Sequence, residues 1–361
     1  MKNVKFKPKD KSDFHQVLRA RVNDYFRSNR IPKYGNLSLQ VKALIMFSLL
    51  WIPMIVLHVV PNIPWYGLIA LGLLIGSGQS GIGLSVMHDA LHAAFFKSKK
   101  WNDRLGTLSM IFVGGYASNW KMQHNQLHHS YTNVHGVDLD INPPSTLLRF
   151  SPYDPLKKVH KYQYLYAWFL YSLMSLFWCV KKDFKDLYLF RELGFYDGKG
   201  SQFKKEVITL IFHRVIYFGF WIGLPVLFTS YTIWQILLVF LFKHLFTGFA
   251  LAVVFQPAHV SDGSSFEIVD DGEVKEDWAI HQLKTTVNFA MTNKIFTWYA
   301  GGLNFQIEHH LFPSVSHVHY PKLAEIVKRT ADEFGIPYLS HPSFRSALIK
   351  HGISLYQLGR A

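Results

Sequence analysis

Residues 43–87 read ALIMFSLLWIPMIVLHVVPNIPWYGLIALGLLIGSGQSGIGLSVM, a stretch that contains no Asp, Glu, Lys or Arg. A helix needs about 20 apolar residues to cross a bilayer, so this stretch is long enough for two crossings. The segment Pro61, Asn62, Ile63 and Pro64 divides it near its centre, and Pro and Asn favour turns. The stretch therefore predicts a helical hairpin in a membrane and, with it, an all-α integral membrane protein.

A second charge-free stretch, Val215–Phe242, supports the same class. The chain of 361 residues is 49% hydrophobic and 16% aromatic, which by itself does not separate a soluble protein from a membrane protein. The net charge of +14 points to a membrane protein, because the basic residues of the chain lie in blocks beside the apolar segments. Residues 1–42, for example, carry eleven Lys and Arg against three Asp. This is typical of a cytoplasmic flank, and without an aromatic and basic recognition motif we expect no nucleic-acid binding.

Four segments are predicted to span the membrane: 41–60, 65–87, 207–229 and 233–255. Uncharged residues, Thr229 to Thr232, connect the last two, as the segment at 61–64 connects the first two. Each pair therefore forms a hairpin that leaves and returns on the cytoplasmic side.

This topology divides the chain into three parts. We expect a cytosolic N-terminal segment at 1–40, a membrane domain at 41–260 and a cytosolic C-terminal cap at 261–361. Within the cap, Pro321–Phe334 has Pro in its first turn and an apolar stripe, which predicts a helix.

A fifth apolar segment, Tyr162–Val180, has lysines immediately before and after it. A crossing would place one of these basic clusters outside, so we expect a helix that lies in the interface or re-enters, with both ends cytoplasmic. The shorter apolar run Leu105–Ala117 is below spanning length and is predicted to behave in the same way.

Histidine supplies the most specific pattern in the chain. Among 19 His, three clusters stand out, HDALH at 88–92, HNQLHH at 124–129 and QIEHH at 306–310, each predicted on the cytoplasmic side. The single Cys179 excludes an internal disulfide and a cysteine-based metal site within one chain. One histidine alone suggests a satisfied interfacial side chain, but the full set predicts a metal site, because so many imidazoles near a bilayer need partners.

Spacing suggests how the rings are grouped. Residues four apart share one face of a helix, so His88 with His92, and His124 with His128, are expected to hold one metal. The remaining rings, those of His129, His309 and His310, are expected to reach a second metal. Imidazole suits iron, zinc, copper or nickel, so the ligands alone do not name the metal.

The sequence resembles the membrane fatty acid desaturases over nearly its whole length. The resemblance rests on HDALH, on HNQLHHSYTN followed by GVDLDINP, and on QIEHHLFP, with their order and the hairpin spacing. It implies two iron ions that use O2 and two electrons to remove hydrogens from adjacent methylenes of an acyl chain. It also implies these metal ligands: His88, His92, His124, His128, His129, His309 and His310, with His259 of FQPAHV as an added ligand.

Gln306 opens the third motif where the commonest family pattern has His. Gln at this place resembles the front-end and linoleoyl-CoA-type desaturases, which insert a double bond between an existing one and the carboxyl end. It could bind metal through its oxygen or support a neighbouring ligand. Relatives of this type often carry a fused cytochrome b5 domain marked by His-Pro-Gly-Gly, which the sequence lacks. We therefore expect electrons from a separate cytochrome b5-type protein or ferredoxin, which the basic cytoplasmic face could dock, although anionic lipid headgroups would be attracted as well.

Other polar residues are weaker candidates. Asp138 and Asp140 could orient ligand imidazoles or be loop residues in solvent, and His281 and Asn304 could contact the site indirectly. Lys243 and His244 lie within an apolar segment, where an ionisable group marks either function or internal pairing. The remaining histidines are expected to be ordinary surface residues: His15, His58, His135, His160, His213, His317, His319, His341 and His351.

The leading hypothesis is an oxygen-dependent desaturase that introduces a cis double bond into a long chain carried by coenzyme A or a lipid. Two alternatives remain open at this point. A hydroxylase could use the same metal centre, and a membrane zinc hydrolase or receptor could hold a single zinc with these histidines.

Overall fold

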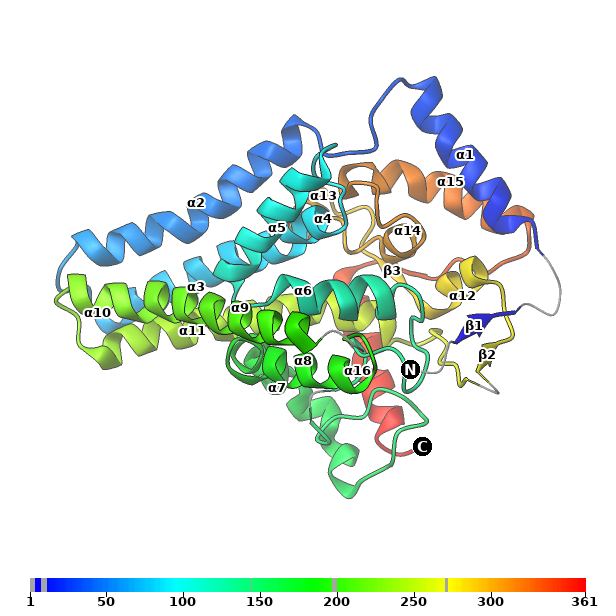
Figure 1. The fold of residues 1–361 in the computed structure, drawn as a ribbon. Helices are drawn as coiled ribbons and strands as arrows, with labels where there is room; N and C mark the ends of the chain where they lie inside the picture. The colour runs from blue at the N-terminus through cyan, green and yellow to red at the C-terminus, as the bar shows by residue number, and fades with distance from the viewer. Residues whose placement is uncertain (1–3, 8–11, 144, 197–199, 270–271) are drawn as a thin grey trace.

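The computed structural model describes residues 4–7, 12–143, 145–196, 200–269 and 272–361. Helices dominate these residues, which confirms the all-α class (Figure 1). Strands are limited to two short parallel pairs within the described part of the chain. One joins β1 (Lys5–Phe6) to β2 (Glu273–Val274), and the other joins β3 (Asn288–Phe289) to β4 (Ser340–His341).

Four helices are long and apolar enough to cross a membrane, as the sequence predicts. The first is α2 (Leu37–Val59), and the second runs through α3 (Trp65–Gly81), η1 (Ile82–Met87) and α4 (His88–Leu91). The third runs through α9 (Gly200–Phe218), η5 (Gly219–Gly223) and α10 (Leu224–Phe228), and the fourth is α11 (Ile233–His259). All four extend several residues beyond the predicted apolar segments at the end away from the hairpin turn, because helical hydrogen bonding continues past the apolar residues.

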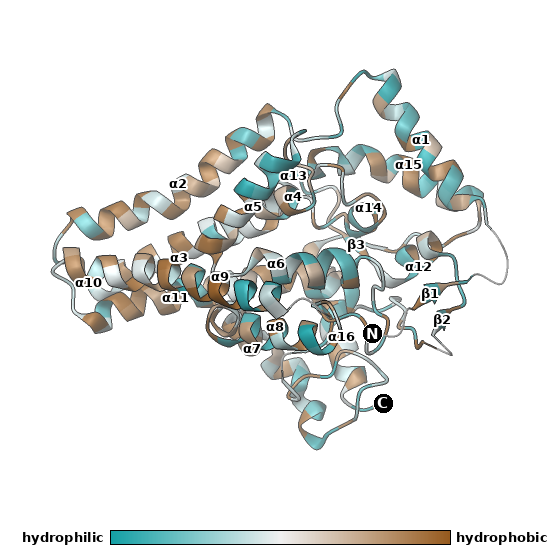
Figure 2. Cartoon of the chain, viewed as in Figure 1, coloured by the Kyte–Doolittle hydropathy of each residue, from teal (hydrophilic) through white to brown (hydrophobic). Residues whose placement is uncertain are grey.

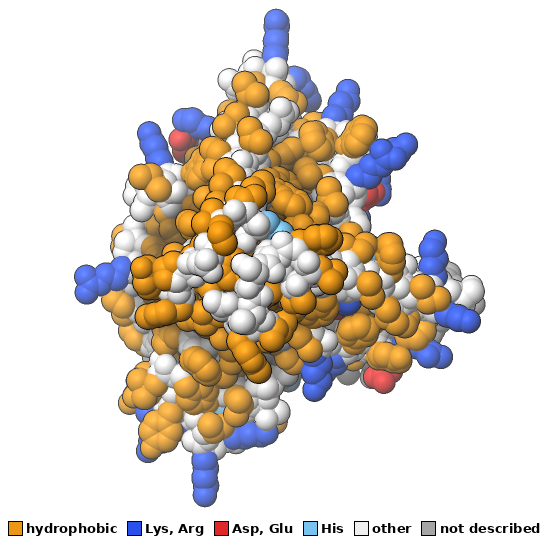
Figure 3. Space-filling view, turned by 90° about the vertical axis from the view of Figure 1, so that its left-hand side faces the viewer, with side chains coloured by type: hydrophobic (Ala, Val, Ile, Leu, Met, Phe, Trp, Pro, Cys, Tyr) orange, Lys and Arg blue, Asp and Glu red, His pale blue; other side chains and the backbone are white. Residues whose placement is uncertain are grey.

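These helices form one end of the molecule, which is rich in hydrophobic residues (Figure 2). The view onto this end shows hydrophobic side chains at the centre, with Lys and Arg at the outline (Figure 3). Trp65 and Trp234 begin the returning helix of each hairpin and are 67% and 77% exposed. Tryptophan at this depth is typical of the boundary between hydrocarbon and headgroups, so the turns mark one edge of the membrane zone.

Small residues let the spans pack closely. A Cβ atom on Gly76 of α3 would lie 2.6 Å from the carbonyl oxygen of Lys243 on α11. On the other side of α11, a Cβ on Gly248 would lie 2.5 Å from the carbonyl oxygen of Ser172. Since either contact is too short for a real side chain, glycine at both positions allows α11 to sit between α3 and α7.

The segment predicted to lie in the interface forms α7 (Gln163–Phe177), preceded by η3 (Lys158–Tyr162) and followed by η4 (Trp178–Lys182) and α8 (Asp183–Glu192). It is not among the helices suited to span, in agreement with the prediction. Nor is α5 (Lys99–Val113), which contains most of the shorter run and ends at Gly114, with φ of +89°.

Opposite the spans lies a cap built from both ends of the chain (Figure 1). The N-terminal helix α1 (Phe14–Ser28) packs on α15 (Tyr320–Glu333), which confirms the helix predicted at 321–334. The other elements of the cap are α12 (Trp278–Thr285), α13 (Lys294–Tyr299), α14 (Gln306–Leu311), η6 (His317–His319) and α16 (Phe344–Leu358). The second histidine motif enters from the middle of the chain on α6 (Ala117–Trp120) and η2 (Lys121–His128).

Candidate metal centre

The three histidine motifs meet where the spans end and the cap begins. His88 and His92 lie at the end of the second span, His124 and His128 on η2, and His309 and His310 on α14. Between them lie His129, directly after η2, and His259, the last residue of α11. All eight side chains are buried, and none is more than 8% exposed.

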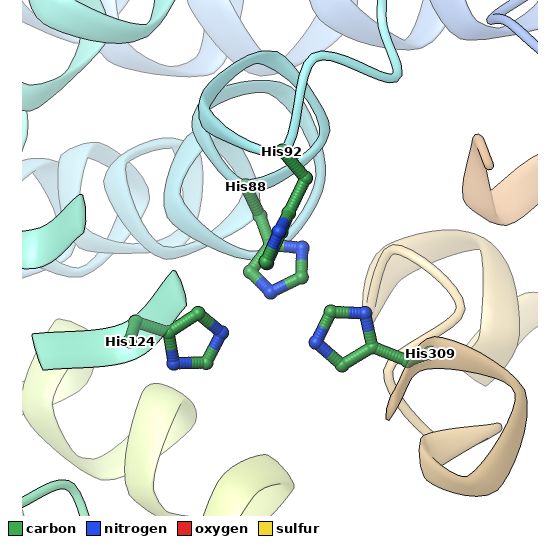
Figure 4. Close-up of side chains that lie close together, drawn as sticks. All are labelled: His88, His92, His124 and His309. Atoms are coloured by element: carbon green, nitrogen blue, oxygen red, sulfur yellow. The ribbon is translucent and has the colours of Figure 1, made fainter. Parts of the chain in front are cut away.

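Four of these rings form a front cluster: His88, His92, His124 and His309. One ring nitrogen from each lies within 4.8 Å of the others. The rings converge on a common point from three separate elements (Figure 4). Ring centroids are 4.5 Å apart for His88 and His309 and 5.2 Å apart for His92 and His124. This is the spacing that one metal ion with several imidazole ligands requires.

His128, His259 and His310 form a rear cluster, again with ligand atoms within 4.8 Å of one another. The ring of His128 lies 4.7 Å from that of His259 and 4.8 Å from that of His310, between centroids. His129 lies between the clusters, with its ring 4.5 Å from His309 and 4.4 Å from His310. The eight histidines thus offer two adjacent metal positions.

Part of this arrangement agrees with the grouping that spacing suggests, because ligand atoms of His129, His309 and His310 also lie within 4.8 Å of one another. The second motif differs from that grouping, because η2 is a π-helix. A π-helix bonds residues five apart, and the backbone N–H of His129 donates to the carbonyl of His124 at 3.0 Å. Consequently the Nε2 atoms of His124 and His129 lie only 3.2 Å apart. His128 meets His259 and His310 in the rear cluster, whereas His309 belongs to the front cluster and also shares a group of ligand atoms with His129 and His310.

Hydrogen bonds fix the orientation of several rings. Nδ1–H of His124 donates to Asp140 at 2.6 Å, and Nδ1–H of His128 donates to Asp138 at 2.9 Å. On α14, Nδ1 of His309 lies 3.2 Å from the Tyr320 hydroxyl. Such partners select the ring nitrogen that remains free to bind a metal, so Asp138 and Asp140 lie where sequence reasoning suggested.

The opposite nitrogens are unpaired. Nε2 of His128, His309 and His310 is buried without a hydrogen-bond partner, as are Nε2 of His92 and both ring nitrogens of His259. An unpaired buried polar atom costs about 1–3 kcal/mol, so several in one place are costly unless another group satisfies them. A pair of metal ions fits this set of free lone pairs.

The electrostatic environment favours neutral imidazoles. Burial lowers the pKa of His309 and His310 well below the usual value, and the neighbouring rings lower it further. His124 has a lowered pKa for the same two reasons. His128 differs, because the charge and hydrogen bond of Asp138 outweigh its burial and raise its pKa. Neutral imidazole is the form that binds metal, so most rings are ready to act as ligands.

The remaining candidates have diverse positions. The Gln306 side chain is 1% exposed and its Oε1 has no partner. Asn304 donates to the Phe289 carbonyl at 3.1 Å and so braces the turn before α14. Nζ of Lys243 donates to the Tyr217 hydroxyl at 2.8 Å and lies 3.8 Å from the centre of the Trp221 ring, which supports internal pairing.

The prediction of surface positions is wrong for three histidines. His317 is 3% exposed and its ring lies between Lys42 and Asp89, at 2.7 Å and 2.9 Å. His351 and His160 are likewise buried, bonded to the carbonyls of Val260 and Thr146, respectively. In each case a hydrogen bond from a distant segment replaces water, which a local sequence window cannot reveal. The other six are partly exposed: His15, His58, His135, His213, His319 and His341.

Sequence reasoning also missed residues that support the ligands. Oε1 of Gln282 accepts from Nδ1–H of His310 at 2.9 Å. Asp89 accepts from the Ser316 hydroxyl at 2.7 Å and so ties the first motif to the cap. The only sequence feature that could have pointed to these residues is their position, since Asp89 lies inside HDALH and Gln282 follows His281.

A cavity of about 360 Å³ opens on the front cluster. His88, His124 and His309 line it, whereas no residue of the rear cluster does. Gln306 also lines it, and Lys182, Lys185 and Asp186 add charge to its wall. Its apolar lining comes from several elements: Leu84, Val113, Phe150, Met174, Phe177, Trp178, Leu251, Phe255 and Leu303. An elongated apolar group could therefore lie beside the front cluster.

Fold and site together define a membrane protein of four spans whose buried polyhistidine centre adjoins an apolar cavity. The chain belongs to the fatty acid desaturase family, whose model matches residues 63–342. It is thus an oxidoreductase that desaturates fatty acyl chains.

Named relatives agree with this membership. The chain is 32% identical to the sn-1 linoleoyl-lipid 6-desaturase of Synechocystis sp., over 97% of both chains. The enzyme of the same name from Arthrospira platensis is also 32% identical, over 93% of this chain and 89% of its own. The acyl-lipid (8-3)-desaturase of Physcomitrium patens is 30% identical, over 97% of this chain and 72% of its own.

Proposed function

We propose that this chain is an O2-dependent acyl-lipid desaturase with two iron ions, which inserts a cis double bond between an existing double bond and the carboxyl end. The observation that carries the proposal is the cavity, which is mostly apolar and ends on the front cluster. An unactivated methylene has no acidic proton, so a side-chain base cannot remove its hydrogen at neutral pH. Two bound irons, together with O2 and two electrons, would supply the oxidant that this reaction needs.

In this proposal the chain's own residues hold the metals and position the substrate. His88, His92, His124 and His309 would hold one iron, and His128, His259 and His310 the other. His129 would complete either position. Asp138 and Asp140 would keep their imidazoles oriented, while the apolar wall would exclude water and keep the acyl chain extended past the reacting carbons.

Gln306 and the named relatives support the position of the new double bond. Two relatives are 6-desaturases of a linoleoyl lipid, and another is an (8-3)-desaturase. Gln306 lines the cavity and lies three residues before His309 in the sequence. Its Oε1 atom, which is buried without a hydrogen-bond partner, could bind iron, or the side chain could contact the acyl chain. The glycerolipid carrier follows from the same names, with coenzyme A as the alternative carrier.

Electron supply and orientation complete the proposal. A separate cytochrome b5-type protein or ferredoxin would deliver electrons at the cytoplasmic side, where basic residues flank the spans. The segment 1–40, the cap 261–361 and the metal centre would all face the cytoplasm, since the basic flanks of the spans favour that side.

Lipid profiling of a host that expresses the chain and receives linoleate tests the proposal. The expected product has lost two hydrogens at a position between the existing double bond and the carboxyl group, and is recovered in the glycerolipid fraction. A gain of one oxygen would instead identify a hydroxylase. Metal analysis of the active protein is expected to give two irons per chain, and a single zinc would contradict the proposed centre.

A further inference from the structure

A third group of potential ligands lies outside the histidine centre. Glu267, Glu276 and His281 place one ligand atom each within 4.8 Å of the others. The backbone holds Glu267 in place, because its N–H donates to the Asn133 carbonyl at 3.1 Å. Glu276 lies just before the Asp277 cap of α12, and His281 lies one turn into that helix.

The His281 ring has a free lone pair in this group. One nitrogen, Nε2, lies 2.7 Å from the carbonyl oxygen of Thr132. A carbonyl only accepts, so Nε2 carries the hydrogen, and the neutral ring has its lone pair on Nδ1. That Nδ1 atom is buried without a hydrogen-bond partner, on a side chain that is 0% exposed. Burial also lowers the pKa of His281, which favours the neutral form that binds metal.

The two carboxylates are close enough to repel one another. Burial raises the pKa of Glu267, and the neighbouring charge of Glu276 raises it further. Lys284 forms an ion pair with Glu276, and its charge also acts to lower the pKa of Glu267, so an ammonium group already lies near both carboxylates; the Lys284 side chain is 38% exposed. A metal ion that displaced this ammonium group would balance both carboxylates and would also satisfy the free nitrogen of His281.

We propose that Glu267, Glu276 and His281 form a separate site for one divalent transition-metal ion. One imidazole and two carboxylates suit Mn²⁺, Fe²⁺ or Zn²⁺. The bound ion would join the loop before α12 to that helix. It would also brace the metal centre, because Glu267 pairs with Val134 in the loop of Asp138, and Gln282 of the same helix contacts His310.

This site can be tested by titrating the iron-loaded protein in detergent with Mn²⁺. Electron paramagnetic resonance measures the concentration of free Mn²⁺ at each point of the titration. Mn²⁺ is the weakest competitor for imidazole sites among these metals, so it should leave the iron in place. The wild type is expected to bind one Mn²⁺ per chain. Glu267→Gln and Glu276→Gln should each weaken this binding at least tenfold while the iron content stays unchanged. Glu325→Gln, on an exposed pair with Lys322, is the matched control and should bind like the wild type.

A gain-of-binding variant separates loss of the site from misfolding. Lys284→Met removes the competing ammonium and is expected to tighten Mn²⁺ binding several-fold, which a misfolded protein would not do. Saturating Mn²⁺ should also raise the melting temperature of the wild type by a few degrees and that of Glu267→Gln hardly at all. The site is refuted if the wild type binds no Mn²⁺, or if both glutamate variants bind it with wild-type affinity. Neither readout depends on desaturase activity.

Discussion

The front and rear clusters have the same ligand chemistry but different access. The front cluster, His88, His92, His124 and His309, borders the cavity through three of its four rings. The rear cluster, His128, His259 and His310, is closed off from the cavity and surrounded by hydrogen-bonded side chains such as Asp138 and Gln282. Identical residue types thus acquire different roles from position alone. We infer that the substrate meets the front metal, while the rear metal completes the pair.

The largest expected effect is loss of a ligand from either cluster. His309→Ala in the front cluster and His128→Ala in the rear should each lower product formation by at least about 100-fold, because the proposed reaction needs both metals. Lipid profiling and iron analysis of the purified protein measure this, with size-exclusion chromatography to show that each variant remains folded. His213→Ala, a partly exposed histidine on α9, is the control. Near-normal turnover in either ligand variant would refute the proposed ligand set.

Removing a carboxylate that orients a ring should have a smaller effect. Asp138→Asn and Asp140→Asn are each expected to weaken iron binding about 10- to 100-fold, because His128 and His124 lose a charged partner. Iron retained after dialysis against a chelator series gives the comparison. Asp138 should matter more, since it is 3% exposed whereas Asp140 is only partly buried. Equal iron retention in both variants and the wild type would mean that these carboxylates do not support ligands.

Filling the cavity should lower activity without removing iron from either cluster. Leu251→Trp adds a bulky ring beside the front cluster and is expected to lower turnover about tenfold, with iron content unchanged, because the acyl chain loses its space. Leu241→Trp on the same helix is the control, since Leu241 is 38% exposed on the outer surface. If Leu251→Trp retains full activity on long chains, the substrate lies elsewhere.

The smallest effect is expected at Gln306. Gln306→His introduces the residue that the commonest family pattern has at this place, and His can bind metal, so iron should be retained. Turnover or the position of the double bond should change a few-fold, because a ring replaces an amide in the cavity wall. Mass spectrometry of products after double-bond derivatisation measures both. An unchanged rate and an unchanged product would show that Gln306 is a structural residue only.

Several features could be predicted because they depend on local sequence. The spans follow from stretches without charge, and α15 follows from an apolar stripe after Pro321. The histidine motifs were visible as clusters, since ligands on one helix lie a few residues apart. His259 is different, because only the family resemblance implies it as a ligand, and its ring meets those of His128 and His310 in the folded protein.

Other features could not be predicted because they depend on contacts between distant residues. The π-helix η2 changes which rings face one another, and no periodic pattern in HNQLHH distinguishes it from an α-helix. The sequence predicts a surface position for His317, yet this residue lies against Asp89, 228 residues earlier in the chain. His351 was misplaced for the same reason.

Hydrophobicity and spacing along single helices are local properties, so the amino-acid sequence is enough to show that this protein is helical, that four segments suit a membrane, and which histidines form the three motifs. The folded chain alone shows that His309 lines the cavity whereas His310 does not, which ring each of Asp138 and Asp140 contacts, and that the cavity reaches the front cluster but not the rear one. The cavity and its contact with one cluster depend on how the cap packs against the ends of the spans, as in the contact of Ser316 with Asp89, 227 positions earlier, which no local pattern relates.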